Sequence, residues 1–118
     1  HSLSASNFYD SALKNYNDTK YKTAIKYLEK EIVFNPKSFE SFILLGKSYE
    51  KIDDLNIANK YYNIAFTLSP HSLELNFLLG KTAYGLGNIE DYAKFISNLE
   101  ILCENDCDEI NNLKLMAE

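Results

Sequence analysis

One feature limits the possible folds of this chain more than any other: the sequence repeats itself every thirty-four residues. The tetrapeptide LLGK at 44–47 recurs letter for letter at 78–81, and at the same spacing Pro36 aligns with Pro70. A fixed period of this length is typical of proteins in which each copy forms one small structural unit that packs on its neighbours. The 118 residues are therefore expected to form a single domain, 1–118, with copies at about 5–38, 39–72 and 73–106 and a tail at about 107–118.

Each copy has the pattern of two amphipathic helices. In the second copy, Phe42, Leu45 and Ile52 keep the three- and four-residue spacing of one helical face. Asp54 suits the N-cap of the helix that follows, and Asn88 suits the same place in the third copy. The pattern predicts an all-α chain of six helices of roughly 13–16 residues. A seventh helix is expected in the tail, with one face made by Ile110, Leu113 and Met116.

The copies resemble the tetratricopeptide repeat, a thirty-four-residue helix-turn-helix unit that carries an aromatic residue, Leu-Gly, Tyr, Ala, an aromatic residue, Ala and Pro in that order. The second copy keeps nearly the whole pattern. The first lacks the Leu-Gly pair and the late Ala, and the third has Tyr92 in place of the small Ala and no closing Pro. The resemblance implies a right-handed superhelical α-solenoid of three units with a C-terminal capping helix. It makes the following positions structural: Phe8, Ala24, Pro36, Phe42, Gly46, Tyr49, Ala58, Tyr62, Ala65, Pro70 and Gly80.

The small residues of the pattern have a packing reason. Gly46 and Gly80 are expected where the first helix of a copy crosses a neighbour closely, and a large side chain at Gly46 would cost about 1–3 kcal/mol. One copy alone cannot bury its apolar face, so the copies must stack. We expect the tail helix to cover the third copy; the alternative is that it begins a fourth repeat.

In such a stack the first helix of each copy lines a concave face. The resemblance gives this face aliphatic and aromatic side chains with a few lysines, which suits an extended or helical peptide. Lys47 and Lys81 take equivalent places there, and our hypothesis is that they bind a carboxylate of the partner; the alternative is that they are ordinary solvated lysines. The residues expected on this face are Tyr9, Leu13, Tyr16, Asn17, Glu40, Ile43, Leu44, Lys47, Lys51, Glu74, Phe77, Leu78, Lys81 and Tyr84.

One group of tetratricopeptide proteins, the co-chaperones that hold the acidic C-terminal tails of heat-shock chaperones, uses a clamp of Lys, Asn, Asn, Lys and Arg in this groove. None of the corresponding side chains of this sequence is a clamp residue. The sequence therefore argues against that co-chaperone role. The corresponding positions are Tyr9, Leu13, Leu44, Glu74 and Leu78.

Composition and motifs argue against several other functions. The net charge is −5 and every basic residue is Lys, so the surface is a poor reader of phosphates and we expect no nucleic-acid partner. No apolar run is long enough to span a bilayer, and no signal peptide is visible. His1 is terminal and His71 follows Pro70 in a turn, and no nucleophile–base pair or Gly-rich phosphate loop occurs. We expect no enzymatic activity, no cofactor and no metal.

The two cysteines, Cys103 and Cys107, are four residues apart and have no nearby His. Two thiols fall short of the four ligands of a structural zinc site. We expect free thiols near a helix end, with a disulfide or an intermolecular metal bridge as the alternatives.

These patterns predict a non-enzymatic protein-interaction module that binds a peptide or helix of another protein. The chain starts with His1 rather than Met, so we expect it to be part of a longer protein, and its compartment stays open between cytoplasmic and exported. The first alternative is an assembly domain that forms a homo-oligomer through the repeat face or the tail, with Leu113, Leu115 and Met116 at the contact. The second is an accessory domain attached to an enzyme.

Overall fold

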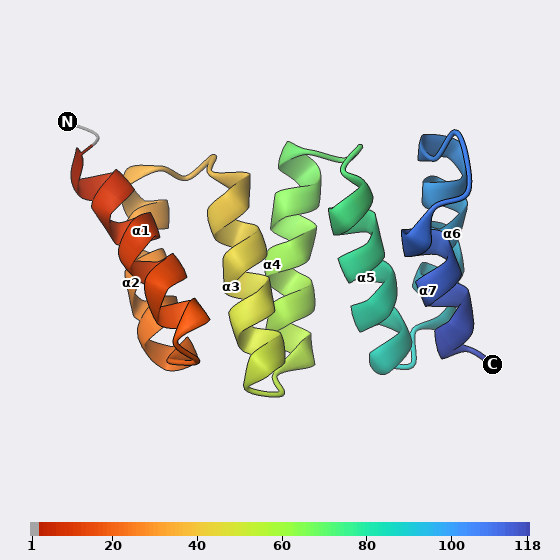
Figure 1. Ribbon diagram of the computed structural model, residues 1–118, viewed down its shortest axis with the longest axis horizontal. Coiled ribbons are helices and arrows are strands. Elements are labelled where there is room, and N and C mark those ends of the chain that lie inside the picture. Colours follow the sequence, from red (N-terminus) through yellow and green to blue (C-terminus); the bar gives the residue numbers. More distant parts are fainter. Residues whose placement is uncertain (1–2) are drawn as a thin grey trace.

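The computed structural model describes residues 3–118, and their side chains from residue 8 onward; His1, set aside above as a catalytic candidate, lies outside the described residues. Seven α-helices follow one another in this part of the chain, and no strand does (Figure 1). The first six have 13 to 15 residues and the last has nine, which confirms the predicted all-α pattern. The helices are α1 (Leu3–Asn17), α2 (Tyr21–Phe34), α3 (Phe39–Lys51), α4 (Leu55–Leu68), α5 (Leu73–Gly85), α6 (Ile89–Leu102) and α7 (Asp108–Met116).

The helices form three pairs that stand side by side along the long axis of the molecule, which measures 44 × 27 × 21 Å (Figure 1). α1 packs on α2, α3 on α4 and α5 on α6, and the second helix of each pair also packs on the first helix of the next pair. In Figure 1 α2 lies behind α1, and α7 stands in front of α6 at the C-terminal end. This arrangement is an α-solenoid of three helix-turn-helix units closed by a cap.

The turn inside each pair uses one residue with a left-handed backbone. These residues are Thr19 (φ 63°), Asp53 (φ 64°) and Gly87 (φ 79°), which occupy equivalent places in the three copies. Only glycine adopts this conformation without a steric cost, and a β-branched residue such as Thr is rare there. The first two turns are therefore strained relative to the third.

Side-chain caps begin the second helices of the later copies, as predicted. The carboxylate of Asp54 accepts a hydrogen bond from the backbone N–H of Ile57 at the start of α4. The side chain of Asn88 accepts one from the backbone N–H of Asp91 at the start of α6. Such caps satisfy N–H groups that have no partner within the helix.

The small residues of the repeat lie at close helix crossings. A Cβ atom added to Gly46 would lie 2.2 Å from Cε1 of Tyr62 on α4, which confirms that only glycine fits at this place. A Cβ atom added to Gly80 would lie 2.7 Å from Cδ1 of Leu113, so the close neighbour of Gly80 is α7. The two glycines therefore have the same place in the repeat and different neighbours. The other fully buried positions of the pattern include Ala12, Ala24, Leu28, Leu45, Ala58, Ala65 and Leu79.

The tail helix α7 covers the end of the third copy, as predicted. Leu113 is fully buried, and Ile110 and Met116 are partly buried against the same cluster. The hydroxyl of Tyr92 on α6 donates a hydrogen bond to the backbone carbonyl of Leu113. The alternative hypothesis placed Leu113 at an oligomer contact on the surface, and the side chain is not available there because it closes the core. Of the three residues proposed for that contact, Leu113, Leu115 and Met116, Leu115 alone remains largely exposed.

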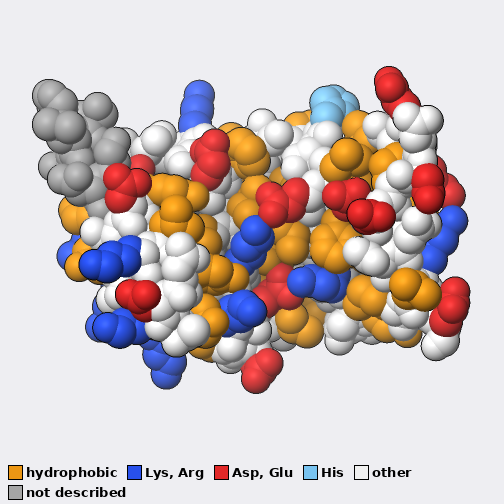
Figure 2. All heavy atoms as spheres, viewed as in Figure 1, with side chains coloured by type: hydrophobic (Ala, Val, Ile, Leu, Met, Phe, Trp, Pro, Cys, Tyr) orange, Lys and Arg blue, Asp and Glu red, His pale blue; other side chains and the backbone are white. Residues whose placement is uncertain are grey.

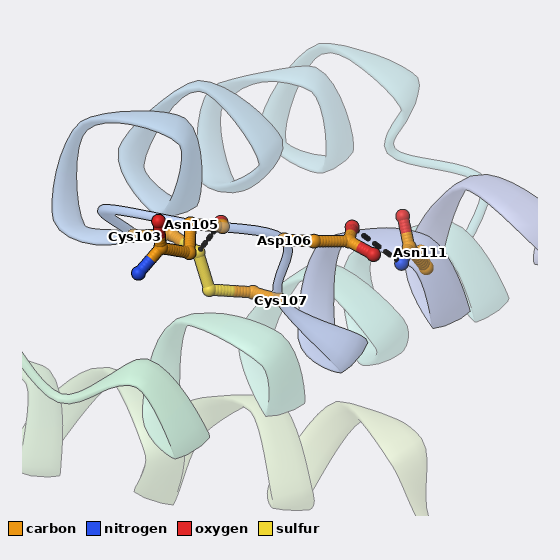
Figure 3. The surroundings of a disulfide bond; sticks show 5 residues. All are labelled: Cys103, Asn105, Asp106, Cys107 and Asn111. Carbon is orange, nitrogen blue, oxygen red and sulfur yellow. Dashed lines mark hydrogen bonds between the residues drawn. A yellow bond between two sulfur atoms is a disulfide. The ribbon is translucent and has the colours of Figure 1, made fainter.

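Cys103 and Cys107 form a disulfide in the loop between α6 and α7 (Figure 3), so the expectation of free thiols is wrong and the disulfide alternative holds. The loop reverses the chain direction after Leu102 and brings the two Cα atoms to 6.3 Å, a separation that a disulfide can bridge. Next to it, the side-chain amide of Asn111 donates a hydrogen bond to the carboxylate of Asp106 at 2.9 Å. Sequence spacing alone does not reveal this reversal, because it depends on where α7 docks.

Candidate functional site

The face formed by α1, α3 and α5 contains two adjoining hollows, which we call the proximal hollow (about 350 Å³) and the distal hollow (about 370 Å³). Both include Tyr16 and Lys47, so together they form one continuous groove. The proximal hollow is lined by Tyr9, Leu13, Tyr16, Asn17, Phe39, Glu40, Ile43, Leu44, Lys47 and Glu74. The distal hollow is lined by Tyr16, Lys47, Glu50, Lys51, Leu78 and Lys81.

The apolar residues of the groove have two different roles. Ile43, Leu44 and Leu78 line it but are buried in the core, so they form its floor and do not project into it. Leu13 is 39% exposed, and Tyr9 and Tyr16 are half-buried beside it. The α1 wall therefore offers the apolar surface that a partner can reach. Helical spacing shows which face a residue lies on, but the neighbouring helices decide how much of it stays exposed.

Of the three lysines that line the groove, Lys47, Lys51 and Lys81, two are already paired with acids of this chain. Nζ of Lys47 lies 2.8 Å from Oε2 of Glu74, and Nζ of Lys81 lies 3.1 Å from Oε1 of Glu50. Both pairs join α3 to α5, and Figure 2 shows lysine and acidic side chains intermixed over the middle of this face. The repeat pattern placed both lysines on this face but did not reveal their partners, which belong to a different repeat in each case.

The pair formed by Lys81 and Glu50 is anchored in the core. The fully buried Tyr62 donates a hydrogen bond from its hydroxyl to Oε2 of Glu50, whose side chain is 17% exposed. Burial of the ring and the negative charge of Glu50 raise the pKa of Tyr62 above its usual range, so the hydroxyl stays protonated and remains a donor. Glu50 is therefore held from both sides, whereas Lys47 and Glu74 are 33% and 55% exposed and free to rearrange.

Phe77 and Tyr84, also expected on the groove face, line neither of the two hollows. Nζ of Lys81 lies 5.7 Å from the centre of the Phe77 ring, a cation–π contact at the edge of the groove. The ring of Tyr84 packs on Tyr92 of α6, with the two ring centres 5.0 Å apart. Both rings are half-buried, and Phe77 contacts the two core clusters on either side of it.

A third hollow of about 310 Å³ adjoins the proximal hollow, and we call it the acidic pocket. Its lining is Tyr9, Asp10, Glu31, Ser38 and Glu40. Glu31 is only 3% exposed, and its Oε1 atom has no hydrogen-bond partner. Burial raises the pKa of the Glu31 carboxyl, the backbone of Tyr9 opposes this by hydrogen bonding, and the charge of Asp10 adds to the rise.

The acidic pocket was not predicted from the sequence. A signal was present, since Glu31 stands where the second copy has the small Ala65. The sequence shows that Glu31 departs from the repeat pattern. It does not show the pocket, because the pocket is lined by residues of α1, α2 and α3 that the repeat pattern does not bring together.

Neither a metal-binding cluster nor a membrane-spanning helix occurs in the described residues. Between residues 3 and 118, no group of three or more His, Cys, Asp or Glu side chains could hold a metal ion. No helix in that range has both the length and the apolar character that a membrane span needs.

The stacked helix pairs and their concave groove define the class: the chain has the fold of tetratricopeptide-repeat domains. No family model and no curated protein matches the sequence. Among solved structures, the first tetratricopeptide domain of Spaghetti (RPAP3) bound to the HSP90 peptide SRMEEVD has a TM-score of 0.87 at 19% identity, over 99% of this chain and 93% of that chain.

Two further structures are similar. The Yersinia enterocolitica type III secretion chaperone SycD, in complex with a peptide of the translocator YopD, has a TM-score of 0.80 at 16% identity, over 96% of this chain and 94% of that chain. MamA has a TM-score of 0.88 at 20% identity, over 98% of this chain and 63% of that chain. Identities this low show a shared fold, and the residues of the groove have to be judged from this chain itself.

Proposed function

We propose that this chain is a non-enzymatic protein-interaction module that binds an extended or helical segment of another protein in the groove. The observation that carries the proposal is the continuous groove on α1, α3 and α5, with apolar surface on the α1 wall and charged side chains on α3 and α5. Such a surface fits a segment whose apolar side chains enter between the helices and whose polar side chains meet the rim. Two of the similar structures are themselves described with bound peptides, which agrees with this use of the fold.

The groove is poorly suited to the acidic tail of a heat-shock chaperone, although the similar RPAP3 domain is bound to such a peptide. Leu44 and Leu78 stand at two of the clamp positions and are buried, so they offer no donor. Glu74 stands at a third, and its carboxylate would repel an acidic tail. We therefore infer that the partner is not of the acidic-tail kind.

Lys47 and Lys81 are each bound to an acid of this chain, so a partner carboxylate competes with that acid for the ammonium group. Glu50 is held by the hydroxyl of Tyr62, so the pair with Lys81 is the less exchangeable of the two. Lys47 and Glu74 are both substantially exposed, and such a pair contributes about 0–1 kcal/mol. We propose that Lys47 is the lysine that a partner carboxylate can recruit. Replacing both lysines with Glu and finding unchanged affinity for the partner would end this idea.

A display library of random peptides, selected on the immobilised chain, tests the function and needs no candidate partner. Leu13→Glu places a charge on the exposed wall of the groove, and we expect the selected peptides to bind it at least about tenfold more weakly, or about 1.4 kcal/mol. Val33→Glu is the matched control, because Val33 is 76% exposed on α2 and lines none of the three hollows. Equal losses in both variants, or none in either, would refute the groove as the binding site.

The homo-oligomer, through the repeat face or the tail, remains the alternative function. In the tail Leu113 is buried and Met116 is half-buried, so Leu115 is the side chain of that contact that stays largely exposed. Size-exclusion chromatography with light scattering separates the two functions. A monomer at all concentrations removes the oligomer, whereas a dimer that is disrupted by Leu115→Glu, with no peptide selected by the groove, would replace our proposal.

A further inference from the structure

The acidic pocket contains Glu31, a charged residue at a position where the repeat fold needs only an apolar one. In the two later copies the position of Glu31 is taken by Ala65 and Leu99, which are fully buried and apolar. A carboxylate at such a position costs stability unless it is paired and hydrogen-bonded. Oε1 of Glu31 has no partner, so the hydrogen bond from the backbone of Tyr9 to this carboxyl offsets only part of the cost.

The neighbours of Glu31 increase the cost. Asp10 from α1 and Glu40 from α3 line the same pocket, and the charge of Asp10 disfavours ionisation of Glu31. Within the described part of the chain, no ion pair joins any of the three acids to a lysine. Lys47, the lysine in the lining of the adjoining hollow, is bound to Glu74. Three carboxyl groups therefore converge on a hollow in which none of them has a cationic partner.

The pocket opens beside the groove. Tyr9 and Glu40 belong to the lining of both the acidic pocket and the proximal hollow. A segment that lies in the proximal hollow therefore passes the mouth of the pocket and can send a side chain into it. Tyr9 stands between the two, where its ring can contact the aliphatic stem of a long side chain.

We propose that the acidic pocket receives a lysine or arginine side chain of the bound segment, held by the carboxylates of Asp10, Glu31 and Glu40. This inference rests on the proposed function, since it names the chemistry of the partner of the same groove. A side-chain cation supplies the charge and the donors that Oε1 of Glu31 lacks, and charge-assisted hydrogen bonds of this kind are the strong ones. A metal ion is the weaker occupant, because the three acids are not arranged as a metal-binding group in the described residues.

The test is a backbone-amide NMR titration of the whole chain with small probes. N-acetyl-arginine amide and N-acetyl-lysine amide carry the cation, and N-acetyl-citrulline amide has nearly the shape of the arginine probe without its charge. We expect at least one cationic probe to shift the amides of Tyr9, Asp10 and Ser38, and the citrulline probe to leave them in place. The response to the two cations shows which side chain the pocket prefers.

Glu31→Gln keeps the shape of the side chain and removes its charge, and we expect at least a tenfold weaker response to the cationic probes. Glu29→Gln is the matched control, because it removes the same charge from an exposed residue of the same helix and should leave the response unchanged. Asp10→Asn, at an exposed position, provides a second variant that should also weaken the response whatever the effect of Glu31→Gln on folding.

Three results would overturn the inference: no shift at these amides with either cation, equal shifts with citrulline, or an unchanged response in both Glu31→Gln and Asp10→Asn. Shifts of the same amides by Mg²⁺ at lower concentration than by the organic cations would replace it with a metal site. These failures are distinct from failure of the groove. If library peptides still bind the parent chain and lose affinity on Leu13→Glu, the groove stands and only the pocket falls.

Discussion

The crossing of α3 and α4 at Gly46 allows a prediction whose size follows from the structure. An added Cβ would lie 2.2 Å from Cε1 of Tyr62, far inside van der Waals contact. The Tyr62 ring is fully buried and its hydroxyl is bonded to Glu50, so it cannot move aside without breaking that bond. Gly46→Ala should therefore destabilise the fold, although alanine is the better helix former.

The expected loss has three parts. Overpacking of a core costs about 1–3 kcal/mol, and loss of a hydrogen bond to a charged group costs about 1.5–3 kcal/mol. Replacement of glycine by alanine inside a helix returns about 1 kcal/mol. The free energy of unfolding should fall by about 1.5–5 kcal/mol in Gly46→Ala, if the three terms are taken as additive.

Urea denaturation followed by circular dichroism measures this loss, and the chain itself supplies the controls. Gly85→Ala meets only the end of a flexible Leu55 side chain, at 3.0 Å, and should change stability by less than about 1 kcal/mol. The first copy has Ala12 and Leu28, both fully buried, at the places of Gly46 and Tyr62. A double variant, Gly46→Ala with Tyr62→Leu, should therefore be less damaged than the sum of its single variants.

A coupling energy of at least about 1 kcal/mol is expected from that double-mutant cycle. If Gly46→Ala is as harmless as Gly85→Ala, the added methyl group does not clash with Tyr62. Losses of the two single variants that simply add would also contradict that clash.

Three further predictions concern other parts of the fold. Burial raises the pKa of Glu31 above 4.5 in the folded chain, so the folded state holds this proton more tightly than the unfolded state does. The free energy of unfolding should therefore fall as the pH rises from about 4.5 through the folded-state pKa. The difference in stability between Glu31→Gln and the parent, measured by urea denaturation, should grow in favour of Glu31→Gln between about pH 4 and pH 7, and a constant difference would contradict this. Leu113→Ala should cost about 2–5 kcal/mol and speed amide exchange throughout α7, and combining it with Gly80→Ala should cost less than the sum; strict additivity would argue against the contact between them. Thr19→Gly should stabilise the fold by up to about 1 kcal/mol, seen as a higher midpoint of thermal unfolding, and Asp53→Gly should stabilise it less. A loss of stability in both variants would show that these turns are not strained.

Much of the architecture could be predicted from the sequence because it depends on local signals. The spacing of Phe42 and Leu45 indicated a helix, Asp54 and Asn88 indicated where helices begin, and the thirty-four-residue period indicated that the units stack. The capping role of α7 followed from its single apolar face. Each of these inferences needs only neighbouring residues or comparison of one copy with the next.

The candidate site was less predictable, because its properties depend on side chains from different helices. The repeat placed Lys47 and Lys81 on the groove face but did not show that Glu74 and Glu50 neutralise them. It identified Leu44 as a groove residue but not as a buried part of the floor. Charges that neutralise each other lie 27 or more residues apart along the chain, where no periodicity links them.

The sequence alone is enough to predict a stack of helix pairs, and the places in each pair that must be small or aromatic, because period, capping and helical spacing can be read from the order of the residues. The docking of the helices determines that Gly46 faces Tyr62 while Gly80 faces Leu113, and that Cys103 meets Cys107. It also determines that Glu31 lies with Asp10 and Glu40 in one pocket. Two residues with the same place in a repeat differ in what the next helix brings against them, and that depends on how whole helices dock.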